Sequence, residues 1–151
     1  RLMELEPRVL TEDCLPAVVA LEAGSHPTPW SEGMFRSEMT QGISYFRVFV
    51  ERESGLLAGY GGFWNMAGDG NITNVTVAPA FRQRGIGRQI VRHLLGAMRT
   101  MGMEYASLEV RKSNQAAIQL YQSCGFGLLG ERPGYYSDGE AALIYGQRVQ
   151  A

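Results

Sequence analysis

The pattern of apolar and polar positions along this chain predicts seven strands and four helices. A period of two, or a short apolar run between turn residues, indicates a strand. Apolar residues three and four apart indicate a helix, most clearly where Ile86, Ile90, Leu94 and Met98 form one stripe. The expected strands are 3–9, 45–51, 56–64, 71–77, 105–111, 126–131 and 142–149, and the expected helices are 14–23, 32–39, 86–101 and 115–124.

The ends of the expected helices carry residue types that start or stop a helix. Asp13 and Ser31 can cap the first two helices, and either Ser113 or Asn114 can cap the fourth. Gly102 is suited to end the third helix, because glycine adopts the left-handed conformation common at helix C-termini. These signals support the element boundaries that the periodicity indicates.

The order of the elements predicts the fold class. Residues 105–111 follow a helical crossover, so that strand is expected to run parallel to strand 71–77. The order strand, helix, helix, three strands, helix, strand, helix and two strands predicts a mixed α/β fold. In it, helices cover both faces of a single, partly antiparallel sheet. A length of 151 residues with 45% hydrophobic content favours one domain over residues 1–151.

Charge and composition argue against several classes of partner. A formal net charge of −1 gives no general attraction to nucleic acid or to an anionic membrane. No apolar run approaches the ~20 residues that span a bilayer, and no secretory leader pattern is seen, so we expect an intracellular, cytoplasmic protein. Cys14, Cys124, His26 and His93 have no metal-ligand spacing, so we expect two reduced thiols and no metal.

A glycine-containing loop just before the third helix is the strongest chemical signal. Residues 82–88 read Arg-Gln-Arg-Gly-Ile-Gly-Arg. At a helix N-terminus, unpaired backbone N–H groups and the helix dipole favour an anion, and glycine lets a phosphate approach closely. Arginines in and beside the loop add local positive charge. The expected ligand is a pyrophosphate, with the alternative that Gly85 and Gly87 only form a tight turn.

The residues after the loop argue against two common phosphate-binding motifs. A P-loop needs Lys followed by Ser or Thr after its last glycine, but Gly87 is followed by Arg88 and Gln89. A dinucleotide-binding loop needs a third glycine at position 90, which is isoleucine. The pattern Arg-x-x-Gly-x-Gly instead resembles the coenzyme A pyrophosphate loop of the GCN5-related N-acetyltransferases (GNAT family).

Further segments extend this resemblance from about Asp13 to Tyr145, and to the branch of the family that acetylates protein N-termini. The matching segments are 29–31, 108–114, 117–121, 125–126 and 135–136. The resemblance implies the GNAT fold, acetyl-CoA as the acetyl donor, coenzyme A as product and direct transfer in a ternary complex. One departure is Glu140-Ala141, where this branch often has two acidic residues, which removes a carboxylate near the expected peptide groove.

The resemblance also implies roles for individual residues. Glu109 would be the general base and Tyr121 the general acid. Tyr135 and Tyr136 would form walls of a peptide groove. Strand main-chain groups and an asparagine would contact the acetyl and pantetheine portions, and the loop would hold the pyrophosphate. The expected cofactor-binding residues are Val75, Thr76, Val77, Gln83, Arg84, Gly85, Ile86, Gly87, Arg88 and Asn114.

Each of these side chains also has a structural alternative. Glu109 can be a strand carboxylate paired with Arg111 or another arginine, because structural ion pairs often imitate functional sites. Tyr121 by itself is typical of a packing aromatic, and Asn114 can be a helix cap as well as a ligand contact. A covalent route through a thiol is less favoured, since neither cysteine has a convincing histidine partner.

Three functions are compatible with the sequence. The first is acetylation of a protein N-terminus, which in the related branch is the N-terminal alanine of a small-subunit ribosomal protein. The second keeps the chemistry but uses a small-molecule amine, and the third is a non-catalytic acyl-CoA sensor. The presence of both Glu109 and Tyr121 disfavours the sensor, and the tyrosine pair at 135–136 favours a peptide. We expect a monomer or weak dimer that binds neither nucleic acid nor membrane.

Overall fold

The structure is a computed structural model that describes residues 3–150, so residues 1, 2 and 151 of the expected domain lie outside the described part. The elements follow the predicted order. They are β1 (Leu5–Val9), α1 (Leu15–Ser25), α2 (Glu32–Glu38), β2 (Ser44–Glu51), β3 (Leu57–Met66), β4 (Asp69–Val77), a 3-10 turn (Pro79–Phe81), α3 (Ile86–Thr100), β5 (Tyr105–Arg111), α4 (Gln115–Ser123), β6 (Gly127–Arg132) and β7 (Ala142–Arg148). No helix in this described stretch is long and apolar enough to cross a membrane.

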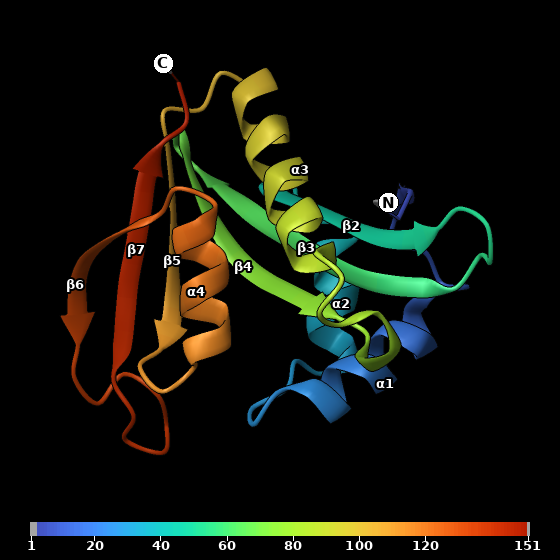
Figure 1. Cartoon of the computed structure of the whole chain (residues 1–151), viewed down its shortest axis with the longest axis horizontal. Helices are drawn as coiled ribbons and strands as arrows, with labels where there is room; N and C mark the ends of the chain where they lie inside the picture. The colour runs from blue at the N-terminus through green and yellow to red at the C-terminus, as the bar shows by residue number, and fades with distance from the viewer. Residues whose placement is uncertain (1–2, 151) are drawn as a thin grey trace.

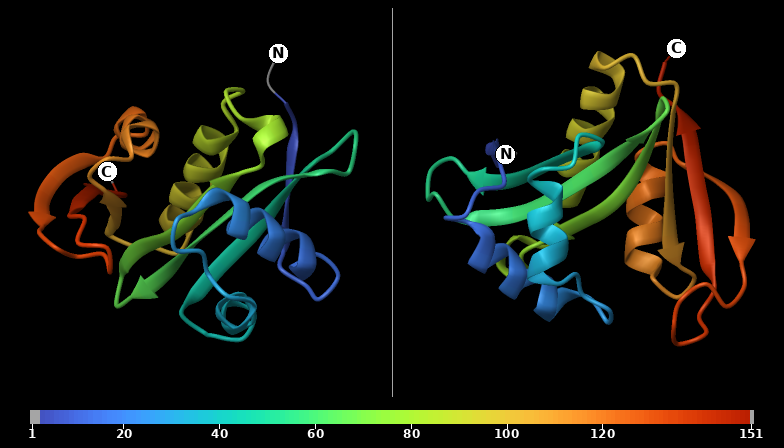
Figure 2. Two further views of the ribbon diagram at one scale, coloured as in Figure 1. Left: turned by 90° about the horizontal axis from the view of Figure 1, so that it is seen from below. Right: turned by 180° about the vertical axis from the view of Figure 1, so that it is seen from behind.

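One sheet of seven strands forms the centre of the described chain, in the order β1-β2-β3-β4-β5-β7-β6. Helices α3 and α4 lie on one face, and α1 and α2 lie on the other (Figures 1 and 2). Neighbouring strands are antiparallel except β4 and β5, which pair in parallel because α3 carries the chain back across the sheet. The predicted mixed α/β architecture and the parallel pair are therefore confirmed.

The parallel pair is short, and this opens the sheet. Strands β4 and β5 pair only from Asp69 to Asn71 on one side and from Tyr105 to Ser107 on the other. Beyond that point the two strands diverge, as Figure 1 shows below the top of the sheet. The edge of 72–77 that faces β5 and the edge of 108–111 that faces β4 do not pair with each other. The sheet therefore contains a V-shaped opening near its middle.

A β-bulge in β4 changes the direction of its side chains where the opening begins. Phe63 pairs with Ile72, but its neighbour Gly62 pairs with Asn74, so Thr73 is an extra residue on β4. Ile72 packs into the core under α3, whereas Asn74 and Thr76 bond to side chains from the α1 end of the molecule. The bulge thus points polar side chains toward the α1 face beside the opening.

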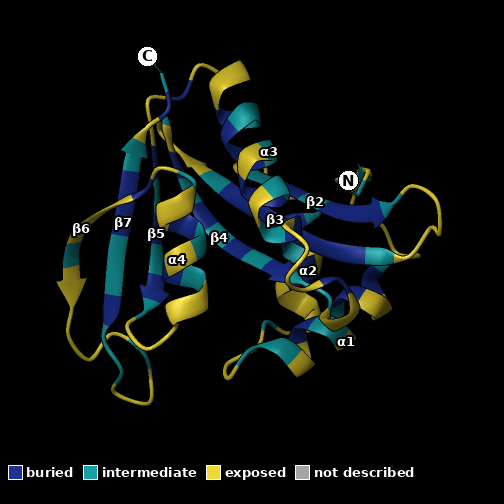
Figure 3. Cartoon of the chain, viewed as in Figure 1, coloured by how far each residue is buried: buried dark blue, intermediate teal, exposed yellow. Residues whose placement is uncertain are grey.

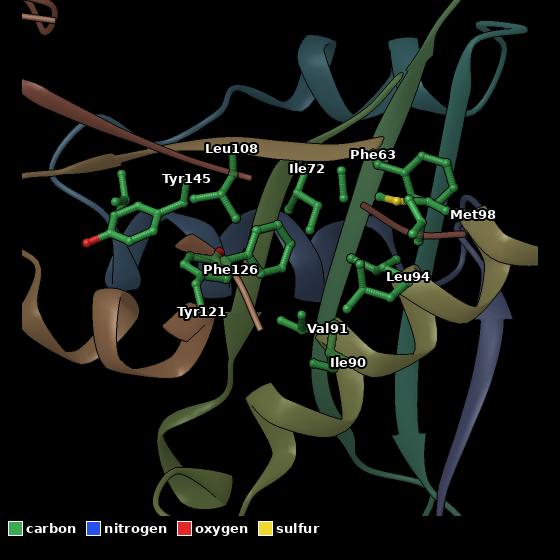
Figure 4. Close-up of a cluster of buried hydrophobic side chains, with 14 of the residues drawn as sticks. Phe63, Ile72, Ile90, Val91, Leu94, Met98, Leu108, Tyr121, Phe126 and Tyr145 are labelled. Carbon is green, nitrogen blue, oxygen red and sulfur yellow. The ribbon is translucent and has the colours of Figure 1, made fainter. Parts of the chain in front are cut away.

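Two apolar clusters hold the layers together, one on each side of the sheet. The larger cluster lies under α3 and α4, and Figure 4 shows its Ile90, Leu94 and Met98 pointing from α3 toward the sheet. The smaller cluster joins α1 and α2 to β2 and β3. Helix α3 lies close on β3, because a Cβ on Gly61 would come within 2.8 Å of Ile90 Cγ2. The buried positions follow the inward faces of the elements (Figure 3).

Two local predictions differ from the structure, and others are confirmed. Asp13 does not cap α1: the N-cap is Cys14, which has helical dihedral angles and makes no side-chain capping bond. The turn after β3 is shorter than expected, because Ala67 and Gly68 both adopt positive φ, and Asp69 and Gly70 already belong to β4.

Two other helix caps are confirmed. Ser31 Oγ accepts a hydrogen bond from the backbone N–H of Met34 at 3.2 Å. At α4 the cap is Asn114 rather than Ser113, and its Oδ1 accepts from the backbone N–H of Ala117 at 3.2 Å. Gly102, with a φ of +75°, follows the C-terminal end of α3 as expected.

Candidate active site

Three hollows follow one another along the opening in the sheet. The loop pocket lies between the N-terminus of α3 and α4, the central cleft lies between β4 and β5, and the outer groove lies toward α2 and the segment before β7. Ala117 lines both the loop pocket and the central cleft. Glu109 and Tyr136 line both the central cleft and the outer groove. The three hollows therefore adjoin through shared residues.

The loop before α3 has the backbone of an anion site. Gln83 and Gly85 have φ values of +62° and +78°, and the first helical bond of α3 runs from the N–H of Gln89 to the carbonyl of Gly85 at 3.1 Å. The N–H groups of Ile86, Gly87 and Arg88 precede that bond, so they have no partner within the helix. Successive unpaired N–H groups in such a loop form a concave anion-binding site.

The two glycines of the loop have different reasons to be glycine. Gly85 faces open space but has the left-handed φ that glycine adopts without a steric penalty. Gly87 instead lies against α4, where a Cβ would come 3.1 Å from Leu120 Cδ2. The first glycine therefore shapes the loop, and the second lets α3 and α4 approach each other.

One loop arginine is held by the protein, whereas others are exposed. Arg82 donates from Nε to the carbonyl of Val77 at 3.2 Å and from Nη2 to Ser25 Oγ at 3.4 Å. Arg84 and Arg88 are exposed beside the loop. Their positive charge is available to a phosphate group.

The expected cofactor contacts on β4 and α4 line the opening. Val75 lies in the central cleft and Val77 in the loop pocket, on the part of β4 that has no strand on its β5 side. Thr76 points its side chain to the α1 face, so only its main chain is available on this edge. Asn114 caps α4 and also lines the central cleft, so it can act both as a helix cap and as a ligand contact.

Glu109 lies between the central cleft and the outer groove, half-buried on β5. Within residues 3–150 its carboxylate has no hydrogen-bond or ion-pair partner. The alternative pairing with Arg111 is wrong, because that guanidinium bonds to Asp138 and to Glu140, each at 2.9 Å. The Glu109 carboxylate is therefore free to act on a molecule in either hollow.

Tyr121 lines the central cleft from α4 and is buried, with its ring edge-on to Phe126 at a centroid distance of 5.8 Å. Burial raises the pKa of Tyr121 well above its ordinary value of 10.0. Within residues 3–150 the Tyr121 hydroxyl has no hydrogen-bond partner, and the residue lines the central cleft.

Tyr135 and Tyr136 form one wall of the outer groove. Their rings meet at right angles, with centroids 5.1 Å apart, and the Arg111 guanidinium lies 4.1 Å from the Tyr136 ring centroid. Glu140 does not face a ligand, because one oxygen accepts from Arg111 and the other from the backbone N–H of Ser113. Arg111 and Glu140 thus position the groove wall.

The opposite wall of the outer groove comes from the α1–α2 segment and α2. Trp30 packs on Phe35 at a centroid distance of 5.0 Å while part of it lines the groove. Glu38 is buried there, and its carboxylate accepts from Trp64 Nε1 and from Ser44 Oγ. The groove has a volume of about 530 Å³, within the range of small-ligand sites.

Several polar residues of the site escaped the sequence analysis. Glu22 and His26 line the central cleft from α1 and its C-terminal end, and Arg111 lines the same cleft and supports the Tyr136 wall of the outer groove. His26 had no recognisable spacing to another functional residue. Its partner Thr76 is 50 positions away, so only the folded chain brings them together.

Comparison with known proteins agrees with this geometry. Residues 15–126 match the model of the acetyltransferase (GNAT) family. Over 133 residues the chain is 36% identical to the ribosomal protein bS18-alanine N-acetyltransferase of Escherichia coli strain K12, covering 86% of this chain and 88% of that protein. Over 112 residues it is 36% identical to the N-alpha-acetyltransferase RimI of Mycobacterium tuberculosis, covering 72% of this chain and 68% of that protein.

A solved structure supports the same assignment. The crystal structure of the ribosomal-protein-S18-alanine N-acetyltransferase from Escherichia coli has a TM-score of 0.86 and 30% sequence identity to this chain. The similarity covers 98% of this chain and 96% of that one, so it includes the opening in the sheet and the loop before α3. From its sequence and its fold, this chain belongs to the acetyltransferase (GNAT) family.

Proposed function

We propose that this chain is an acetyl-CoA-dependent N-alpha-acetyltransferase whose acceptor is the N-terminal alanine of ribosomal protein bS18. The relatives named for that activity cover most of the chain at 36% identity, which supports the choice of acceptor. The chain acts as one catalytic domain in this proposal.

The observation that carries the proposal is the position of Glu109. It stands unpaired where the central cleft meets the outer groove, and the cleft leads through Ala117 to the open amides of the loop. A donor with its phosphates on the loop and an amine in the outer groove would therefore meet beside this carboxylate. A binding module needs the loop alone and has no use for a free carboxylate at this junction.

The residues of the loop fit the diphosphate of coenzyme A. The unpaired N–H groups of 86–88 and the exposed Arg84 and Arg88 offer hydrogen bonds and charge to an anion. The open edge of 75–77 offers main-chain groups to an extended amide-containing arm, as an added strand would use them. Acetyl-CoA, when bound, supplies the thioester carbonyl that an amine attacks.

Two side chains would handle the protons. An α-amino group has a pKa of about 7.7–8.0, so it needs only modest help to become neutral at pH 7, and Glu109 would accept that proton. Tyr121 would give its proton to the departing sulfur, because its raised pKa keeps the hydroxyl protonated at neutral pH. A backbone N–H on the open edge of β4 would donate to the carbonyl oxygen.

The test is release of free thiol from acetyl-CoA, measured with a panel of amines. The panel holds peptides that start with the bS18 N-terminus, the same peptides with a blocked N-terminus, and small amines such as polyamines. Glu109→Gln is expected to lose about 100- to 10,000-fold in rate with the free peptide. Glu104→Gln, an exposed residue just before β5, is the matched control and should keep the wild-type rate.

Each other outcome assigns a different function. Turnover with small amines alone would show that the peptide acceptor is wrong. Tight binding of coenzyme A without turnover of any amine would support the acyl-CoA sensor. Equal rates for Glu109→Gln and wild type would show that Glu109 takes no part in the chemical step.

A further inference from the structure

A buried carboxylate in the wall of the central cleft accepts hydrogen bonds on both of its oxygens. Glu22 on α1 is only 2% exposed. Its Oε1 accepts from the Tyr60 hydroxyl at 2.7 Å and from Asn74 Nδ2 at 3.0 Å, and its Oε2 accepts from the backbone N–H of Trp30 at 3.0 Å. Donors on both oxygens compensate the loss of hydration that burial imposes on a carboxylate.

These bonds determine which nitrogen of His26 carries a proton. Asn74 points its Nδ2 at the Glu22 carboxylate, so its Oδ1 is the atom that faces Thr76. Thr76 therefore donates its one hydroxyl proton to Asn74, over 2.8 Å. The Thr76 oxygen can then only accept from His26 Nε2, which lies 2.7 Å away. The neutral ring thus carries its proton on Nε2.

The other ring nitrogen is left as a base that the cleft can reach. His26 Nδ1 has no hydrogen-bond partner among residues 3–150, and it is not a buried unpaired atom. The side chain is 32% exposed and lines the central cleft together with Glu109 and Tyr121. Behind the ring, Glu22 Oε1 lies 3.6 Å from Nε2.

We propose that His26 is a second proton acceptor in the central cleft and that Glu22 is the residue that positions it. This inference rests on the proposed function. Transfer of an acetyl group to an ammonium removes two protons from nitrogen. As the nitrogen–carbon bond forms and the carbon–sulfur bond breaks, Tyr121 gives its proton to sulfur and one proton from nitrogen restores the Tyr121 hydroxyl. The other proton must leave the site. His26 Nδ1 takes that second proton, from the amine or from Glu109, and passes it to solvent.

Several charged and titratable groups line the same cleft as His26 or adjoin it, so the pH test compares variants that differ at one residue. They are Glu22 on α1, Tyr60 on β3, Arg82 beside Ser25, Glu109 and Arg111 on β5, Tyr121 on α4 and Tyr136 before β7. Arg111 already pairs with Asp138 and Glu140, so it does not compete for Glu22.

The first test is the rate of His26→Gln as a function of pH. The glutamine amide can still donate to Thr76 but cannot accept a proton, so the cluster keeps its bonds and loses the base. We expect kcat/KM with the acceptor peptide to fall about a hundredfold at pH 7, with an unchanged Kd for coenzyme A. The deficit should shrink above about pH 9, where the α-amine is already neutral.

His93→Gln is the matched control, because His93 lies on α3 beside Tyr45, outside the three hollows of the site. It should keep the wild-type pH profile. A His26→Gln deficit that is constant with pH would indicate a structural role and overturn the inference, as would wild-type activity. If wild type accepts only small amines, the proposed function fails, and the same comparison with that amine still tests His26.

The second test reads the proton directly and needs no turnover. The chain has two histidines, so the His93→Gln variant leaves the ring signals of His26 alone in a nitrogen-15 NMR spectrum. We expect a protonated Nε2 and an unprotonated Nδ1 in the neutral ring. A neutral ring with its proton on Nδ1 would overturn the inference even if His26→Gln is slow.

Discussion

Asn71 and Ser107 form the last parallel pair between β4 and β5, and their side chains bond across it, with Asn71 Nδ2 donating to Ser107 Oγ over 3.3 Å. The next residues on β4 and β5 have no pairing with each other. This pair therefore marks the point at which the sheet opens into the central cleft. The bulge at Thr73 follows two residues after Asn71. The sheet therefore opens, and the side chains of β4 change direction, at nearly the same place.

We predict that Asn71→Ala lowers the free energy of unfolding by about 1 kcal/mol, the net worth of one partly buried hydrogen bond. Ser107→Ala should cost a similar amount, and the double variant should cost less than the sum, because both lose the same bond. Urea denaturation of the four proteins measures this. Fully additive losses would show that the two side chains do not interact.

Gly85→Ala should weaken the binding of coenzyme A by about tenfold. Its left-handed φ of +78° costs an alanine roughly 1–2 kcal/mol, so the loop would relax and misalign its N–H groups. Isothermal titration with coenzyme A measures the change in Kd. The control is Gly96→Ala inside α3, which has open space around the added methyl and should increase stability by about 0.5–1 kcal/mol.

Tyr121→Phe should lower kcat by about a hundredfold or more while leaving the Kd of coenzyme A unchanged. The ring and its contact with Phe126 remain, so only the hydroxyl is lost. Steady-state kinetics with the acceptor peptide, together with a thermal melt, separate the two effects. An active Tyr121→Phe enzyme would return Tyr121 to the role of a packing aromatic.

Tyr136 should govern the binding of the acceptor more than the rate of transfer. Tyr136→Phe keeps the ring under the Arg111 guanidinium, whereas Tyr136→Leu loses that contact and part of the groove wall. We expect a several-fold rise in the peptide KM for the leucine variant and a near wild-type KM for the phenylalanine variant. Equal KM values for all three proteins would remove Tyr136 from acceptor binding.

His93 should make the stability of the protein fall in mild acid. Burial, and then the positive charge of Arg47, lower the pKa of His93 below its ordinary value of 6.5. The unfolded chain therefore binds the proton more readily, so the stability contributed by neutral His93 is complete above pH 6.5 and is lost as the pH falls below it. His93→Gln should flatten the decline in unfolding free energy between pH 7 and 5. An unchanged slope would exclude His93 as its source.

The sequence alone predicted the parts of this protein that depend on neighbouring residues. The stripe on α3, the caps Ser31 and Asn114 and the loop at 82–88 are local patterns, because helix periodicity, capping and turn conformation involve residues only a few positions apart. The order of elements then limited the fold to a mixed sheet with a parallel crossover. The cap at Asp13 failed because α1 begins one residue later than expected, at Leu15, and its N-cap Cys14 makes no side-chain capping bond.

The folded chain decided how far β4 and β5 pair, where β4 bulges and which polar groups meet. Such features depend on contacts between residues far apart in sequence, such as Thr76 with His26 and Arg111 with Asp138. Their energies depend on burial and on competing partners, which no local pattern contains. The sequence therefore allowed Glu109 to be either paired or unpaired. In the tertiary structure Arg111 pairs with Asp138 and Glu140 instead, which leaves the Glu109 carboxylate unpaired.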